Sequence, residues 1–136
     1  MIIQIKKLTP TARMPEQKMG AGFDLYSDEA VTIRPDSLWL VDLGVASSFK
    51  GGVIIFKDRS GVALKGVEVH AGVIDPEYRG EWRVLLKNAS HCDVRIEVGD
   101  RIAQALPFVT PTIFFDEVAT LDETERGDGA FGSTGR

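Results

Sequence analysis

Short apolar runs separated by turn residues recur from one end of this sequence to the other, and they constrain its fold more than any other feature. The turns between them include Arg34-Pro35-Asp36, Lys50-Gly51-Gly52 and Val98-Gly99-Asp100. Such runs, with turns at short intervals, are typical of β-strands. Residues 60–65 are the best candidate for a helical turn, which is too short to change the class. We therefore predict an all-β fold, a jelly-roll-like distorted barrel, with strands at residues 2–5, 31–33, 38–41, 53–56, 67–69, 82–86 and 94–98.

The size and charge of the chain exclude several classes of protein. With 136 residues, 43% of them hydrophobic, it fits one ordinary domain. The formal net charge of −4 argues against a surface built to attract nucleic acid. The N-terminal residues lack the order of a secretion signal, and no apolar run approaches membrane-spanning length. We therefore expect a cytoplasmic protein with no nucleic-acid or membrane partner, located in the host cytoplasm if a virus or phage encodes it.

Two local features carry little weight in a chain of this kind. Cys92 is the single cysteine, which excludes an intrachain disulfide and a cysteine metal cluster. Asn88-Ala89-Ser90 matches a glycosylation triplet, but this match matters only in a secreted protein.

Residues 72–80 lie between the apolar runs 67–69 and 82–86, so we expect them to form the projecting tip of a β-hairpin. Within this tip Asp75 follows Ile74 and precedes Pro76, which stiffens the turn. A carboxylate held at the edge of a core can orient a water molecule as a general base. The alternative is an aspartate that only caps the turn.

Arg59 and Ser60 follow the run 53–56, which places them at the end of a strand. A guanidinium offers a planar fork for phosphate, and a serine hydroxyl can donate to a leaving oxygen. The alternative is an ordinary surface turn. Asp24 also has two interpretations, a turn at a strand end or a contact to a metal ion through water.

Residues 122–136 are polar and glycine-rich and lack strand periodicity, so we expect a flexible arm after a core of residues 1–121. Residues 127–132 match the dinucleotide fingerprint, but the four residues that follow leave no room for the helix that this motif requires. The arm also carries an aromatic ring, an arginine and two hydroxyls, which could close over a nucleotide. A disordered tail without a ligand is the alternative.

Taken in order, five segments resemble the motifs of the homotrimeric dUTPases, the deoxyuridine 5′-triphosphate nucleotidohydrolases. They are Ala-Gly-Phe-Asp-Leu at 21–25, Arg-Ser-Gly at 59–61, Gly-Val-Ile-Asp-Pro-Glu-Tyr-Arg-Gly-Glu at 72–81, Gly-Asp-Arg-Ile-Ala-Gln at 99–104 and Arg-Gly-Asp-Gly-Ala-Phe-Gly-Ser-Thr-Gly at 126–135. The third and the fifth are each specific on their own.

This resemblance implies a jelly-roll-like barrel of the dUTPase type. It also implies three subunits with active sites at their interfaces, and an arm that closes over a neighbouring subunit's site. The implied reaction is hydrolysis of dUTP to dUMP and pyrophosphate with Mg²⁺, by attack of water on the α-phosphorus. Such an enzyme limits uracil in DNA and supplies dUMP for dTTP synthesis.

The same resemblance assigns roles residue by residue. Asp75 would orient the attacking water, and Ser60 would bond the α,β-bridging oxygen that leaves. Asp24 would reach Mg²⁺ through water, and Tyr78 would pack against the deoxyribose and exclude a 2′-hydroxyl. The other implied substrate-binding residues are Arg59, Gly61, Gln104 and Arg126 near the phosphates, Val69, Gly72, Val73 and Ile74 at the uracil edge, and Phe131, Gly132, Ser133 and Thr134 in the arm.

Three residues depart from the family pattern. Asp58 stands where proline is usual, Ala105 where leucine is common, and Ala130 within the usual Gly-Gly-Phe-Gly. Asp58 places a negative charge beside Arg59, and it would weaken phosphate binding if it pointed inward. Ala130 matters if its position needs a positive φ.

Three other interpretations compete with a dUTPase. A dCTP deaminase would share the fold and a related hairpin, but it needs a glutamate in the following strand, where this chain has Leu85. A regulatory nucleotide-binding module would not need Asp75. A structural trimer without a ligand explains the β pattern but none of the motifs.

Overall fold

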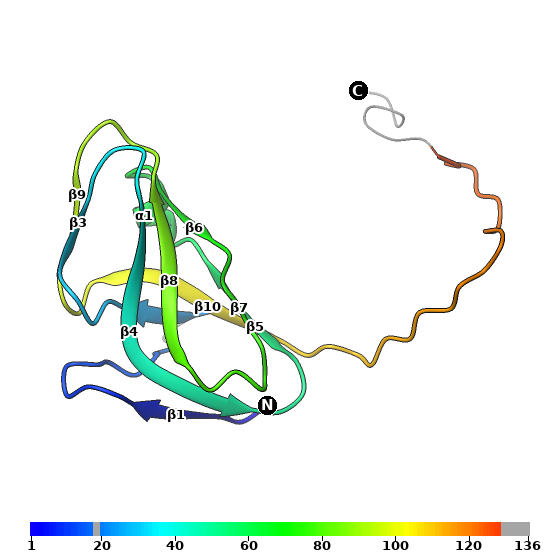
Figure 1. Cartoon of the computed structure of the whole chain (residues 1–136), viewed down its shortest axis with the longest axis horizontal. Helices are drawn as coiled ribbons and strands as arrows, with labels where there is room; N and C mark the ends of the chain where they lie inside the picture. The colour runs from blue at the N-terminus through cyan, green and yellow to red at the C-terminus, as the bar shows by residue number, and fades with distance from the viewer. Residues whose placement is uncertain (18–19, 129–136) are drawn as a thin grey trace.

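In its computed structural model, the described part of the chain folds into antiparallel β-sheets with one short helix, α1 (Ser60–Ala63) (Figure 1). The structure describes residues 1–17 and 20–128. One four-stranded sheet has the order β1 (Ile3–Lys7), β4 (Leu38–Phe49), β8 (Glu81–Asn88) and β6 (Val67–His70). The other has the order β2 (Phe23–Tyr26), β10 (Arg101–Phe108), β5 (Val53–Lys57) and β7 (Val73–Ile74), and β3 (Val31–Ile33) pairs with β9 (Val94–Ile96). The predicted all-β, jelly-roll-like class is confirmed.

The core follows from the two-residue alternation of the strands. Along β8, Trp82, Val84 and Leu86 are buried, while the residues between them are exposed or half-buried. The Trp82 ring meets Phe56 of the other sheet edge to face, with 5.4 Å between the ring centroids. Its indole N–H donates to the buried Ser47 hydroxyl at 3.0 Å, so a polar group sits in this core at little cost. These contacts hold the two sheets face to face.

The apolar runs of the sequence predicted most of the strands, but they made some strands too short and missed others. β4 continues through the predicted run at 38–41 as far as Phe49, and β2 and β10 had not been predicted as strands. The polar residues of β4 and β10 interrupt the apolar pattern, although they too lie in paired strands. Tertiary pairing therefore extends strands across residues whose local pattern is mixed.

The segment between β6 and β8 differs from the predicted hairpin tip. β6 and β8 do pair antiparallel, as expected. The intervening β7, however, pairs with β5 in the other sheet, with Ile74 opposite Ile54 and Val73 opposite Ile55. Residues 72–80 thus bridge the two sheets instead of projecting freely, and this anchors one side of the loop that carries Asp75.

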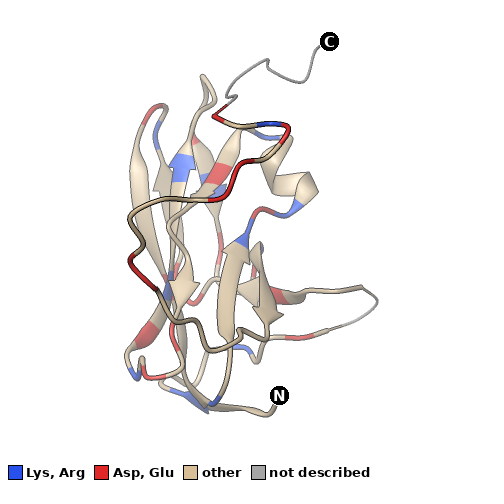
Figure 2. Ribbon diagram, turned by 90° about the vertical axis from the view of Figure 1, so that its right-hand side faces the viewer, with Lys and Arg blue, Asp and Glu red and all other residues tan. Residues whose placement is uncertain are grey.

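Charged residues of both signs are interspersed along the ribbon (Figure 2). This distribution agrees with the small net charge of the sequence. Within the described residues, no helix is long and apolar enough to cross a membrane.

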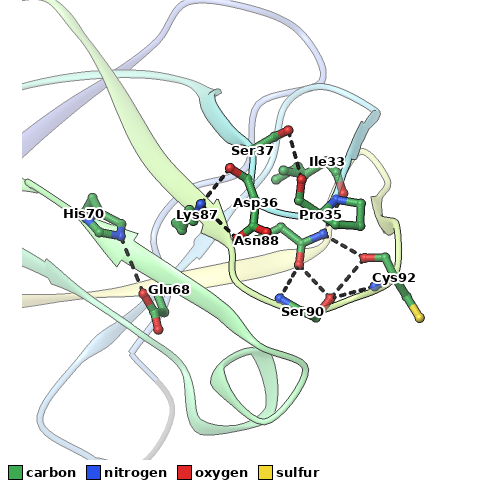
Figure 3. Close-up of polar contacts among 10 residues, drawn as sticks. All are labelled: Ile33, Pro35, Asp36, Ser37, Glu68, His70, Lys87, Asn88, Ser90 and Cys92. Carbon is green, nitrogen blue, oxygen red and sulfur yellow. Dashed lines mark hydrogen bonds and ion pairs between the residues drawn. The ribbon is translucent and has the colours of Figure 1, made fainter.

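Asn88 holds the end of β8 to β3 and to the loop that follows β8 (Figure 3). Its side chain is fully buried, and its amide donates to the carbonyls of Ile33 and Cys92, both at 2.8 Å. Its amide oxygen accepts from the backbone N–H and the hydroxyl of Ser90 at 2.9 and 2.7 Å. The residue is therefore a structural amide, and the glycosylation triplet at this position has no accessible acceptor.

After Phe108 the chain leaves the barrel, as Figure 1 shows. Residues 109–124 form no helix or strand and are exposed. This stretch is nevertheless rich in large apolar side chains, and Phe114 and Phe115 are 89% and 97% exposed. The boundary at residue 121 between core and arm stays a prediction.

Candidate active site

Asp24 sits between two guanidinium groups. Its Oδ1 accepts from Arg59 Nε at 2.8 Å, and its Oδ2 accepts from Arg101 Nη1 at 3.1 Å. Arg59 also donates through Nη1 to the carbonyl of Arg101 at 3.2 Å. The Asp24 side chain is 18% exposed and that of Arg59 is 26% exposed, so the pair is only partly screened by water. One carboxylate thus orients two cations toward the same region.

Gln104 joins this cluster through strand pairing. It lies opposite Asp24 of β2 and opposite Lys57 of β5, at the centre of the sheet. Its side-chain amide donates to the carbonyl of Asp58 at 2.8 Å. A β-carbon on Gly22 would come within 2.7 Å of the Gln104 side-chain oxygen, so a glycine leaves room for this amide. The structure therefore brings the predicted residues Asp24, Arg59 and Gln104 together.

Asp58, one of the three departures from the family pattern, does not pair with Arg59 in this structure. Its carboxylate accepts from the backbone N–H of Val69 at 2.5 Å. The Arg59 guanidinium turns instead to Asp24. The Asp58 carboxylate is therefore directed to β6 and away from the Arg59 guanidinium, and its effect on phosphate binding stays a prediction.

Ser60 begins α1, directly after the extended residue Arg59. The hydroxyl of Ser60 is exposed and has no hydrogen-bond partner within the part of the chain that the structure describes. Gly61 follows with open space around its α-carbon. The predicted placement of Arg59 and Ser60 at the end of a strand is confirmed.

Asp75 lies at the other end of β5. It follows the buried Ile74 and is exposed, and its carbonyl accepts from the N–H of Tyr78 at 3.1 Å to close a turn. Its carboxylate has no hydrogen bond or ion pair to any residue in the described ranges. The Tyr78 hydroxyl donates to the carbonyl of Glu81 at 2.9 Å, and this bond fixes the ring in the same loop that carries Asp75.

The two groups of candidate residues line separate pockets. One pocket contains Arg59, Gly61, Lys65, Arg95 and Arg101, and the other contains Gly72, Val73, Ile74, Asp75 and Tyr78. Ile74 pairs with Ile54, so the next residue, Asp75, lies near Val53. Ser60 is seven residues after Val53 in the chain. An extended chain advances about 3.3 Å per residue, which separates Asp75 from Ser60 by on the order of 20 Å. One chain does not bring these two residues together.

The remaining predicted residues lie in the arm. Arg126 is exposed in the last described turn. Phe131, Gly132, Ser133 and Thr134, and the departure Ala130, lie outside the described residues.

Sequence reasoning missed Arg101 as a site residue. It stands within the Gly-Asp-Arg segment at 99–101, but its side chain could not be placed from the sequence. The residue pairs with an aspartate 77 positions earlier in the chain. The available signal was its place in the Gly-Asp-Arg-Ile-Ala-Gln segment at 99–104, which also carries Gln104.

Comparison with known proteins decides among the competing interpretations. The dUTPase family model matches residues 10–135. The chain belongs to the dUTPase family.

Relatives of this dUTPase share nearly its whole length. A deoxyuridine 5′-triphosphate nucleotidohydrolase of Helicobacter pylori is 43% identical over 141 aligned residues, covering 99% of this chain and 97% of that protein. The enzyme of the same name from Arabidopsis thaliana is 44% identical, covering 97% of this chain and 82% of its own length. The chain is accordingly a dUTP diphosphatase. The comparisons favour this interpretation over a deaminase, a regulatory module and a purely structural trimer.

Solved structures agree with the dUTPase fold. The dUTPase of Staphylococcus bacteriophage 80alpha with dUPNHPP superimposes with a TM-score of 0.92 at 29% identity, covering 99% of both chains. A mutant dUTPase from phage phi11 of S. aureus, described with a structural Mg(II) ion, has a TM-score of 0.83 at 26% identity, covering 90% of this chain and 99% of that one.

Proposed function

We propose that this dUTPase acts as a homotrimer in which each active site combines Asp75 of one chain with Ser60 of a neighbour. The observation that carries the proposal is the separation of these residues, on the order of 20 Å along one chain. In-line attack needs the water-orienting group and the leaving-group donor around one phosphorus atom. Two chains packed side by side would meet this need.

The proposed reaction is a single displacement at the α-phosphorus. The Asp75 carboxylate, which has no partner in the described part of the chain, orients a water and accepts its proton as the oxygen attacks. The bond from the α-phosphorus to the α,β-bridging oxygen breaks, and the Ser60 hydroxyl donates to that oxygen as pyrophosphate leaves. The products are dUMP and pyrophosphate.

Arg59, Gln104 and Arg126 would hold the triphosphate. The geometry around Asp24 favours this role for Arg59, because a guanidinium fixed through its Nε keeps its other N–H groups oriented. Gln104 is fixed in the same way by the carbonyl of Asp58. Gly61 would leave space for the phosphates beside them, since a β-carbon there meets nothing within 4 Å.

The uracil edge would meet the backbone between Val69 and Ile74. The pocket at this segment is lined by Gly72, Val73 and Ile74, and Gly72 has a φ of 93°, a conformation that favours glycine. Tyr78, whose ring is fixed by its bond to Glu81, would fill the space that a 2′-hydroxyl needs.

Mg²⁺ is the proposed cofactor, and the available donors fit an ion that binds mainly to phosphates and water. In the described ranges, no group of three or more His, Cys, Asp or Glu side chains is placed to hold a metal ion. Asp24 offers one carboxylate whose oxygens already accept from arginines, which suits a contact through water. When bound, the ion would neutralise charge that develops on the phosphate oxygens.

The exposed apolar side chains support assembly of several chains. Phe114 and Phe115 in the stretch after β10, and Leu38 and Leu40 on β4, are all more than 40% exposed. Leu40 lines the same pocket as Asp75, so the apolar surface adjoins the candidate site. Surfaces of this kind are typical of protein interfaces. The arm, with Phe131, Gly132, Ser133 and Thr134, would close over the bound nucleotide, Phe131 stacking on the uracil.

The first test is pyrophosphate release from dUTP with Mg²⁺, compared with dCTP, dTTP and UTP. We expect selective release from dUTP. Asp75→Asn should abolish turnover and retain nucleotide binding. Asp93→Asn is the matched control, because Asp93 is exposed and lines neither candidate pocket. Turnover by Asp75→Asn would exclude Asp75 as the base.

A mixing experiment tests the composite site. Asp75→Asn and Ser60→Ala chains, each inactive alone, are unfolded together and refolded at equal amounts. If each site draws the two residues from different chains, about a quarter of the sites in random trimers regain both groups. Recovery of activity supports the composite site, and no recovery in trimers verified by light scattering contradicts it. The cytoplasmic location stays a prediction.

A further inference from the structure

Asp58 makes two contacts that join separate parts of the candidate site. Its carboxylate Oδ1 accepts from the N–H of Val69 at 2.5 Å. Its backbone carbonyl accepts from the side-chain amide of Gln104 at 2.8 Å. Val69 begins the proposed uracil-reading segment, and Gln104 belongs to the proposed phosphate cluster. Asp58 therefore links the proposed uracil-reading segment to the proposed phosphate cluster.

The uracil-reading segment needs such support because its backbone is strained. Ala71 has a φ of 56°, in the left-handed region, and Gly72 follows with a φ of 93°. A residue with a β-carbon in that region costs about 1–2 kcal/mol relative to the right-handed helical conformation. Bonds on both sides of the turn must therefore hold it in place.

Support on the C-terminal side comes from β5. The N–H of Phe56 donates to the carbonyl of Gly72 at 2.8 Å, and β7 pairs with residues 54 and 55. A β-carbon on Gly72 would lie 2.9 Å from the β-carbon of Phe56, so the two backbones are in close contact there. This side of the turn is held by main-chain hydrogen bonds and by the buried Ile74.

Support on the N-terminal side comes from the pairing of β6 with β8 at Val69 and His70, and on the other edge of β6 from a side chain. Phe56 bonds Gly72 through its backbone N–H, and Asp58, two residues later, bonds Val69 through its side chain. Where the ladder to β7 has ended, the carboxylate of Asp58 supplies the acceptor for Val69 in β6. A carboxylate acceptor makes a stronger bond to N–H than a neutral carbonyl does.

We infer that Asp58 is a positioning residue that fixes the strained segment 69–74 in the conformation that binds the uracil edge. The inference rests on the proposed function of that segment. Asp58 contacts neither the phosphates nor the reacting atoms in this scheme, so its loss should weaken base binding and leave the chemical step unchanged.

The test compares Asp58→Ala with Asp58→Asn in the full chain. Inhibition by dUMP reports on the base-reading segment, and inhibition by pyrophosphate reports on the phosphate cluster. In the alanine variant we expect dUMP binding to weaken about five- to tenfold, the effect of losing one charge-assisted hydrogen bond. Pyrophosphate binding and kcat should stay within about twofold, because the carbonyl that holds Gln104 remains. The asparagine variant keeps an acceptor oxygen at this position, so its dUMP binding should recover most of its strength.

A second readout does not depend on activity. The amide proton of Val69 should shift upfield in the NMR spectrum of the alanine variant and stay close to its original position in the asparagine variant. Asp93→Ala, which removes an exposed aspartate without described partners, controls for the change in net charge.

Unchanged dUMP binding in the alanine variant would overturn the inference. Equal weakening by alanine and asparagine would also overturn it, since charge and not the acceptor would then be responsible. Failure of the unsubstituted enzyme to hydrolyse dUTP would instead reject the proposed function, and the Val69 amide shift would still test the hydrogen bond.

Discussion

The phenol ring of Tyr78 occupies the space that a side chain at Gly80 would need. A β-carbon on Gly80 would come within 2.4 Å of the Tyr78 hydroxyl and 2.5 Å of the ring carbon that bears it. Both atoms are held by the hydroxyl's bond to the carbonyl of Glu81. Gly80 therefore permits the ring position that we propose for excluding a ribose.

Gly80→Ala should reduce the discrimination between dUTP and UTP. The added methyl group displaces the Tyr78 ring, and we expect the ratio of kcat/KM values to fall about tenfold, as when one shape contact is lost. Steady-state assays with the two nucleotides measure this ratio. Gly51→Ala is the control for a change that displaces no side chain. Its φ of 65° makes alanine strained there, but the site is exposed and the added β-carbon has no neighbour within 4 Å. Unaltered selectivity in Gly80→Ala would separate the ring from sugar selection.

Arg101→Met should raise KM for dUTP about fivefold with little change in kcat, because one charge-assisted hydrogen bond to Asp24 is lost. Without it, Asp24 holds Arg59 less firmly, while the carbonyl of residue 101 remains to accept from Arg59. Arg34→Met, at an exposed turn, is the matched control. A fall in kcat alone would place Arg101 in the chemical step.

Asn88→Ala should destabilise the fold by about 2–4 kcal/mol, because it leaves buried backbone groups without partners. The carbonyl of Ile33 and the N–H of Ser90 lose the Asn88 side chain as their partner, while the carbonyl of Cys92 keeps the Ser90 hydroxyl as a donor. Ser90→Ala, which removes one hydroxyl from the same network, should cost about 1 kcal/mol. Urea unfolding measures both values, and equal losses would contradict the central place of Asn88.

Deleting residues 122–136 should lower kcat/KM at least about 100-fold, as expected when substrate positioning is lost. The far-UV spectrum should change little, because the described part of the deleted segment, residues 122–128, contains no helix or strand. Activity and circular dichroism on the same preparation distinguish these effects. Full activity of the shortened chain would show that the arm is dispensable.

The free energy of unfolding should fall as the pH rises above 10. Burial, followed by the hydrogen bond to Glu16, raises the pKa of Tyr26 above its ordinary value of 10.0. Between the unfolded and the folded pKa the unfolded chain binds fewer protons, so stability present below pH 10 is lost with increasing pH. Tyr26→Phe should flatten this decline in urea titrations. An identical slope in both proteins would exclude Tyr26 as its source.

Local pattern was enough for the strands whose apolar residues alternate or cluster. Trp82 to Leu86 predicts β8, and the two-residue period then assigns its buried face. The chemical types of the candidate residues, Asp75 and Ser60 among them, are also a property of the sequence alone. The resemblance to dUTPases, which the family match confirms, arises from such groups in a fixed order.

Tertiary structure decided which of these groups meet. Asp24 contacts Arg101 only because β2 pairs with β10, across 77 residues of chain. The fold likewise determines the partner of Asp58, whose carboxylate accepts from the N–H of Val69 and does not pair with the adjacent Arg59. It also separated Asp75 from Ser60 along β5, which makes a second chain necessary for the proposed site. Side-chain periodicity is local and can be read along the chain, whereas strand order and register depend on long-range packing that no short segment contains.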